Sequence, residues 1–163
     1  MCLLFFTEDL NQQAQASASK NHSRKKLLPK KLKSKNAQLG ETLAAIATDL
    51  KGSLGRWSFT LDGYEMAVLT DVNADRMRII APVIESKSLS RDGLETLLSA
   101  NFDRALDAKY SINKGVVWAT FTHPLNDLTT KEFKSALKQV ASLVRTYGTT
   151  HSSMDVVFGG RAQ

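Results

Sequence analysis

Three histidines and one cysteine are the residues of this sequence best suited to metal binding or nucleophilic chemistry. His22, His123 and His151 lie far apart in the sequence, and none has a partner at the spacing of a metal site. Cys2 has no neighbouring cation or histidine that would activate its thiol. His123 follows a predicted strand, where it could meet Asp127, but a turn histidine in solvent is the simpler interpretation. We expect no metal site and no cofactor.

Motifs for phosphate binding or acyl transfer are also missing from the sequence. Gly159 and Gly160 are too short a run for a phosphate loop or a dinucleotide fingerprint. There is no Gly-x-Ser-x-Gly segment of the kind that presents a hydrolase nucleophile. Trp57, Tyr110 and Trp118 could line a ligand pocket, yet their alternation with polar residues is typical of packing on a sheet. The sequence therefore predicts a protein that is not an enzyme.

The positive charge of the chain is confined to its N-terminal part. The net charge is +6, and residues 1–36 hold eight lysines and arginines against two acids, whereas residues 37–163 hold fourteen of each. We expect residues 1–36 to be a disordered basic arm, because their apolar content is too low to offset the entropy of ordering. The alternative is an arm that binds nucleic acid or anionic lipid, without specificity and with strong salt dependence, since no aromatic residue accompanies its cations. The candidate polyanion contacts are Lys25, Lys26, Lys30 and Lys31.

Membrane and export signals are weak in this sequence. No apolar run approaches the ~20 residues of a membrane helix. The apolar residues 2–6 are too few for a signal peptide, and no basic residue precedes them. The alternative that a mis-assigned start codon truncates a longer leader stays open. A single cysteine fits a reducing compartment. We expect a cytoplasmic protein.

The pattern of apolar residues changes period along residues 37–83. Leucine and isoleucine recur at helical spacing over residues 37–54, which predicts a helix that ends at Gly52 and Gly55. Three alternating segments follow, which predict strands. Asp62 and Gly63 predict a two-residue hairpin between the first two strands. In the third strand, Pro82 predicts either an exposed edge or a bulge.

The second half of the chain carries clear helix signals. Ser90 predicts the N-cap of a helix whose Leu94, Leu97 and Leu98 face inward. Two strands follow, at residues 106–112 and 116–121, and both faces of the second are partly apolar. Thr129 and Glu132 form a capping box at the start of the last helix. Residues 151–163 are expected to be a flexible tail.

The predicted order of elements is α-β-β-β-α-β-β-α, in one domain over residues 37–150. Short hairpin connections favour an antiparallel sheet of five strands, and the apolar stripes place three helices on it as a second layer. The fold class is therefore α+β. A profilin-like or PAS-like α+β sandwich is the alternative.

Three segments carry a resemblance to a known fold. Residues 89–102 (LSRDGLETLLSANF), the strand 116–121 (VVWATF) and the helix start 128–133 (LTTKEF) occur in an order that resembles the type III secretion chaperone-like fold. Within it the chain looks most like the YbjN-type bacterial regulators, of the class called sensory transduction regulators. The resemblance covers about residues 37–148. It implies a homodimeric, non-enzymatic domain that binds a polypeptide segment.

The expected dimer interface is the second helix with the strands around it. A two-layer domain needs only one apolar sheet face, yet the strand at 116–121 offers apolar groups to both. An apolar patch left on water is unusual in a soluble monomer, and two-fold pairing is a common way to cover one. The remaining sheet edge could accept a strand from a partner. The interface residues predicted in this way are Phe102, Leu106, Tyr110 and Trp118.

Overall fold

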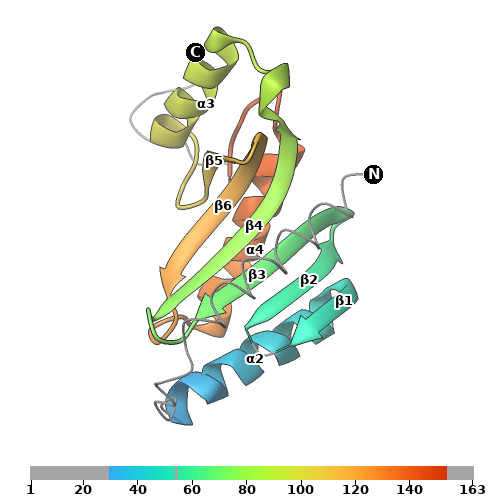
Figure 1. Ribbon diagram of the computed structural model, residues 1–163, viewed down its shortest axis with the longest axis vertical. Helices are drawn as coiled ribbons and strands as arrows, with labels where there is room; N and C mark the ends of the chain where they lie inside the picture. The colour runs from blue at the N-terminus through green and yellow to red at the C-terminus, as the bar shows by residue number, and fades with distance from the viewer. Residues whose placement is uncertain (1–29, 54, 154–163) are drawn as a thin grey trace.

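A single six-stranded antiparallel sheet frames the described part of the chain, residues 30–53 and 55–153 of a computed structural model (Figure 1). The strand order is β1-β2-β3-β4-β6-β5. The strands are β1 (Thr48–Ser53), β2 (Arg56–Leu61), β3 (Tyr64–Asp71), β4 (Arg76–Glu85), β5 (Lys109–Asn113) and β6 (Val116–Pro124). The helices are α2 (Lys30–Ile46), α3 (Arg91–Asp103) and α4 (Thr130–Arg145), with a 3₁₀ turn, η1 (Ser86–Ser88), before α3.

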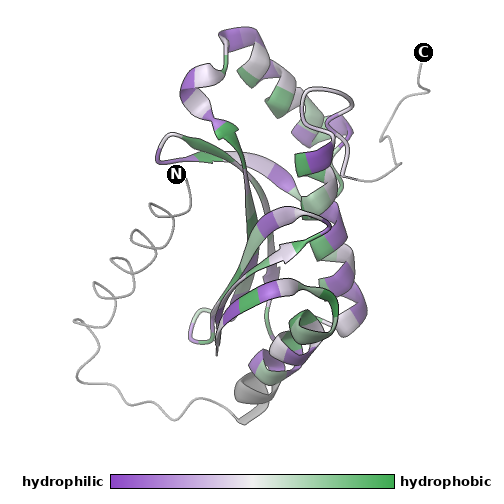
Figure 2. Cartoon of the chain, turned by 90° about the vertical axis from the view of Figure 1, so that its right-hand side faces the viewer, coloured by the Kyte–Doolittle hydropathy of each residue, from purple (hydrophilic) through white to green (hydrophobic). Residues whose placement is uncertain are grey.

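The core lies between one face of the sheet and the helices. On that face the central strands carry side chains that are fully buried, among them Met77, Ile79 and Val117. Helix α4 covers them (Figure 2), and its own apolar stripe is buried from Phe133 to Leu143. Helix α2 packs beside α4 at one end of the sheet, while α3 lies at the other end, next to β5 (Figure 1). The predicted α+β class, with helices layered on an antiparallel sheet, is confirmed.

The first helix and the strand count differ from the prediction. The helix spans Lys30–Ile46 instead of residues 37–54, and a sixth strand, β1, follows it. Leu50 continues the helical spacing of Leu39 and Leu43, but it packs against the core from edge strand β1. A left-handed backbone at Asp49, with φ of 52°, is incompatible with a continued helix. Spacing alone cannot separate a further helical turn from a short strand that covers the same core.

The predicted turns are confirmed. Asp62 and Gly63 have φ of 52° and 82° and join β2 to β3 as a two-residue hairpin of the kind in which both positions have positive φ. Pro82 lies at a register shift in β4, so it marks a bulge in a central strand and not a sheet edge. The strand predicted from residue 106 begins only at Lys109.

The predicted starts of α3 and α4 are also confirmed. The Ser90 hydroxyl accepts a hydrogen bond from the Gly93 amide at 3.1 Å, which caps α3. The capping box of α4 is complete: Glu132 accepts from the Thr129 amide at 2.8 Å, and Thr129 Oγ1 accepts from the Glu132 amide at 3.2 Å. Both motifs satisfy amides that have no partner within the helix itself.

Candidate protein-interaction surfaces

Helix α3 is held mainly by its two ends and by the edge of the sheet. Among its residues only Leu97 and Ala100 are buried. At its C-terminal end the Lys109 ammonium donates to the carbonyl oxygens of Asn101, Ala105 and Leu106, at 2.6 to 3.0 Å. The Asn101 carbonyl is in the last turn of α3, where carbonyls have no partner within the helix, and a cation also favours the negative end of the helix dipole. The helix is therefore fixed in place while much of its surface stays open.

The outer side of α3 carries an exposed apolar surface, which we call the α3 patch (Leu94, Leu98, Phe102 and Ile112). Leu98 is 69% exposed, Phe102 87% and Ile112 of β5 52%. Leu98 and Phe102 lie one helical turn apart, so their side chains share a face. Leu94, Leu98 and Ile112 also line a groove of about 200 Å³ between α3 and β5. Large apolar side chains gathered in this way on a protein surface are typical of interaction sites.

The predicted interface residues do not form one surface. Phe102 belongs to the α3 patch, and Leu106 is half-buried in the connection between α3 and β5. Tyr110 is only 6% exposed, and its hydroxyl donates to the Leu143 carbonyl of α4 at 2.7 Å. Burial raises the pKa of the Tyr110 phenol. Tyr110 pairs with Ala119 of β6 and faces the core. Trp118 is the residue before Ala119 in β6, so its side chain lies on the opposite face of the sheet. The expectation that Tyr110 and Trp118 share one exposed patch is therefore corrected.

Two residues of the α3 patch lie outside the predicted interface because of their sequence context. Leu98 is predicted on the buried side of its helix together with Leu97, but adjacent helical positions point about 100° apart and only Leu97 is buried. Ile112 lies on the same sheet face as Tyr110, near the end of β5, where the covering layer stops and leaves the side chain exposed. The pair of adjacent leucines is the signal that could have revealed the patch.

The second candidate surface is the sheet face opposite α4, which we call the open sheet face. The strand register places Leu69, Ile80, Pro82 and Trp118 on it, from three central strands. Each of these side chains is half-buried, and none of the described helices covers this face (Figure 1). Trp118 Nε1 donates to the Asn113 carbonyl at 3.2 Å, which orients the indole across the end of β5. The expectation of a β6 strand that is apolar on both faces is confirmed.

Both outer strands resist the addition of a further strand. The side-chain amide of Asn101 bonds to the backbone of Tyr110 in β5, accepting from its N–H at 2.7 Å and donating to its C=O at 3.0 Å. Asn101 thus occupies the place that a neighbouring strand would take. At the other edge, β1 has a register irregularity, with positive φ at Asp49 and Gly52. A partner polypeptide is therefore better received by the α3 patch or the open sheet face than by a sheet edge.

The residues with catalytic potential are dispersed. Within residues 30–53 and 55–153, no group of three or more histidine, cysteine, aspartate or glutamate residues could hold a metal ion. His123 lies 2.8 Å from the Pro124 carbonyl through Nδ1 and stacks on Phe121. His151 lines a cleft beside α3 that does not include His123. The helices described here include none that is long and apolar enough to cross a membrane.

The predicted polyanion contacts lie at or beyond the start of the described region. Lys25 and Lys26 are outside the described residues. Lys30 and Lys31 are the first residues of α2, and their side chains also fall outside the description. Polyanion binding by this group stays a prediction.

Comparisons with known proteins identify the fold. No protein-family model matches the sequence, and no curated protein matches it. Among solved structures, the ExsC-ExsE complex contains a chain with a TM-score of 0.55 and 22% identity, over 70% of this chain and 94% of that one. The Yersinia pestis type III secretion chaperone SycH, in complex with a stable fragment of YscM2, has a TM-score of 0.50 and 16% identity, over 69% of this chain and 98% of that one. The chain therefore has the α+β fold of the type III secretion chaperones.

Proposed function

We propose that this chain is a non-enzymatic, chaperone-like protein-binding module that acts as a homodimer and binds a polypeptide segment. The α3 patch is the observation that carries the proposal, because Leu98 and Phe102 are among the most exposed large apolar side chains described. Two solved structures of this fold are complexes, one of ExsC with ExsE and one of SycH with a fragment of YscM2. A place in the cytoplasm and a relation to YbjN-type regulators are parts of this proposal.

The two surfaces suggest a division of roles. The α3 patch is compact and lies at one end of the molecule, so a second copy related by two-fold symmetry can cover it with the same patch. The open sheet face is broader and combines Leu69, Ile80 and Trp118 with the cation Arg78, which pairs with Leu69 across β3 and β4. Such a mixed surface suits a polypeptide segment that carries both apolar and acidic residues. We therefore assign the dimer contact to the α3 patch and the bound segment to the open sheet face.

The mass in solution tests the dimer. Light scattering coupled to gel filtration should give about twice 18.0 kDa for the full chain. Leu98→Arg should yield a folded monomer, because a charge buried in an apolar contact is costly. Thr96→Arg is the matched control, since Thr96 is exposed on another face of α3, and it should stay dimeric. A monomeric wild type at tens of micromolar, or a dimeric Leu98→Arg variant, would reject this interface.

A comparative pull-down tests the polypeptide site. The wild type and the variants Trp118→Glu and Lys138→Glu carry the same tag, and mass spectrometry identifies the captured proteins. Lys138 is exposed on α4, so its variant controls for the added negative charge. Loss of the same captured protein from Trp118→Glu alone supports the open sheet face.

The N-terminal cations provide a separate proposal, non-specific nucleic-acid binding, which a steep fall of affinity with salt would support.

A further inference from the structure

The segment after α4 turns back and bonds to the end of that helix. We call residues 149–153 the strap. The backbone N–H of His151 donates to the Thr146 carbonyl at 3.0 Å. The Ser152 carbonyl accepts two hydroxyl bonds from α4 and its cap, from Ser142 at 3.1 Å and from Thr146 at 2.9 Å. Ser153 is completely buried. Residues 151–153, expected to begin a flexible tail, are thus tied to the domain, and residues 154–163 lie outside the described part.

The strap also bonds to the connection between α3 and β5. Ser153 Oγ accepts a hydrogen bond from the Leu106 amide at 2.5 Å. Arg104, the C-cap of α3, donates through Nη1 to the Thr150 carbonyl at 3.2 Å, and its own carbonyl accepts from the Ser152 hydroxyl at 3.3 Å. The same end of α3 is also held by the Lys109 ammonium and by the side chain of Asn101, while the helix as a whole buries only two side chains. The strap therefore couples the end of α4 to the end of α3.

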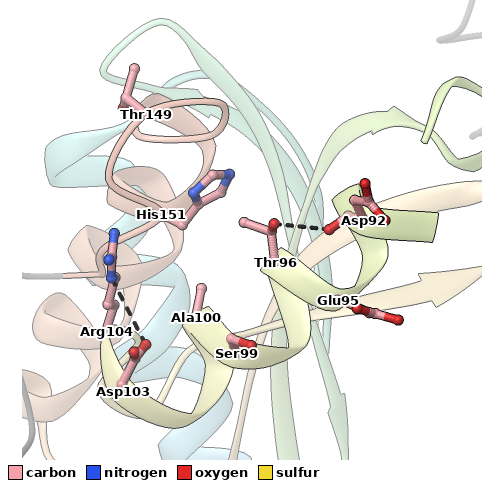
Figure 3. A pocket seen from close by; sticks show the side chains of 9 residues that line it. All are labelled: Asp92, Glu95, Thr96, Ser99, Ala100, Asp103, Arg104, Thr149 and His151. Carbon is pink, nitrogen blue, oxygen red and sulfur yellow. Dashed lines mark hydrogen bonds and ion pairs between the residues drawn. The ribbon is translucent and has the colours of Figure 1, made fainter. Parts of the chain in front are cut away.

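His151 occupies the centre of the strap and is held in its neutral form. Its Nε2 accepts a hydrogen bond from the Gly148 amide at 3.1 Å, which a protonated ring nitrogen cannot do. The ring also packs edge-on against Tyr110, with centroids 6.1 Å apart, and against Tyr147, with centroids 5.8 Å apart. Figure 3 shows the ring at the wall of a cleft of about 440 Å³ between the strap and α3.

We propose that the strap is a proton-sensitive latch on α3: protonation of His151 releases residues 149–153 from α4 and loosens the end of α3. The released imidazolium would face the opposite wall of the cleft, where α3 presents Asp92, Glu95 and Asp103. These carboxylates favour the open, charged state, whereas the hydrogen bond from the Gly148 amide and the burial of the ring favour the closed, neutral state. This inference concerns the single protomer and does not rest on the proposed function.

The charged and titratable groups around the ring agree with this direction. Burial lowers the pKa of His151, the Arg104 guanidinium lowers it further, and a backbone hydrogen bond to Thr149 opposes both. Tyr110 from β5 stays neutral in this pH range, because burial raises the pKa of its phenol. A histidine whose pKa is lowered in the closed state stabilises that state fully above its ordinary value of 6.5 and progressively less as the pH falls below it. The latch therefore opens on mild acidification.

Amide exchange and a ring titration in the full chain test the latch. The Leu106 amide, bonded to the strap, should lose protection severalfold between about pH 7.5 and about pH 5, relative to the remote Thr70 amide, which bonds to the Gly55 carbonyl. The ratio of the two protection factors removes the intrinsic effect of pH on exchange. In proton NMR, the His151 ring should titrate below the ordinary histidine range.

Two variants separate the latch from general acid sensitivity. His151→Asn keeps a side-chain acceptor and tolerates the backbone φ of 53°, so the strap should stay closed at both pH values. His123→Asn should leave the pH dependence of the Leu106 amide unchanged. A constant protection ratio in the wild type, or a pH dependence that persists in His151→Asn, would overturn the proposal. If His151→Asn does not fold, a wild-type His151 ring that titrates at or above pH 6.5 would overturn it equally.

Discussion

The Tyr110 side chain joins strand β5 to helix α4 inside the core. Its hydroxyl bonds to the Leu143 carbonyl, and its ring lies 6.5 Å from that of Tyr147. Tyr110→Phe keeps the ring and leaves one buried carbonyl without this partner, so we expect a loss of about 1 to 2 kcal/mol in the free energy of unfolding. Urea denaturation measures it, with an unchanged m-value as the sign that the fold is kept. Tyr147→Phe alters a half-buried neighbour, so it should lower the free energy of unfolding by less than Tyr110→Phe does. Equal losses in the two variants would contradict this role.

Gln139 of α4 is a second buried side chain that bonds to the backbone of another segment, and it is only 2% exposed. Its Oε1 accepts from the amides of Asp107 and Ala108, at 3.0 and 3.2 Å, and its Nε2 lies 3.4 Å from the Asp107 carboxylate. The amide side chain thus completes the backbone hydrogen bonds of the turn into β5. Buried polar groups are retained where they satisfy such backbone groups. The sequence offers no sign of this role, because a glutamine within a helix is ordinarily exposed to solvent.

At the scale of single elements, the capping box sets the start of α4. Thr129→Ala removes the acceptor of the Glu132 amide, and we expect a loss of about 1 kcal/mol in the free energy of unfolding. Thr130→Ala, one position further on, is the control. The hydrogen bonds from Thr129 lower the pKa of the Glu132 carboxyl. Their contribution is therefore present above the ordinary value of 4.5 and declines as the pH falls through the lowered pKa. The difference between wild type and Thr129→Ala should shrink in acid, and a constant difference would contradict the role of the carboxylate.

The elements that could be predicted from the sequence are those specified by local chemistry. The caps at Ser90 and Thr129 and the Asp62–Gly63 turn depend on residues that are neighbours in the chain, so a short pattern contains the whole signal. Strand β1 and the exposed side of α3 depend on what else packs there. Leu50 and Leu98 are both apolar residues at helical spacing, and only the tertiary structure decides that one is in a strand and the other on the surface. The α3 patch is therefore predictable only in part.

At the scale of the whole molecule, the boundary of the folded domain has a measurable consequence. The charge pattern predicts an arm that ends at residue 36, so that its removal would cost little stability. In the structure, however, Lys35 Nζ donates to the Leu128 carbonyl at 2.7 Å, which ties α2 to the loop before α4. Asn36 is 6% exposed and its Oδ1 accepts from the Thr70 hydroxyl at 2.9 Å, which ties α2 to β3. The last residues of the basic segment thus contact two other elements of the domain.

Two truncations test where the stabilising contacts begin. A chain that lacks residues 1–29 retains the whole of α2, and we expect it to unfold at a temperature close to that of the full chain. A chain that lacks residues 1–36 loses both long-range bonds and shortens α2, so it should melt lower by about 5 to 10 °C, as a loss of about 2 kcal/mol implies for a domain of this size. Differential scanning calorimetry measures both. The melting temperatures of Lys35→Met and Asn36→Leu in the full chain show how much of the lowering is due to each contact. Equal melting temperatures for the two truncated chains would show that the fold needs nothing before residue 37.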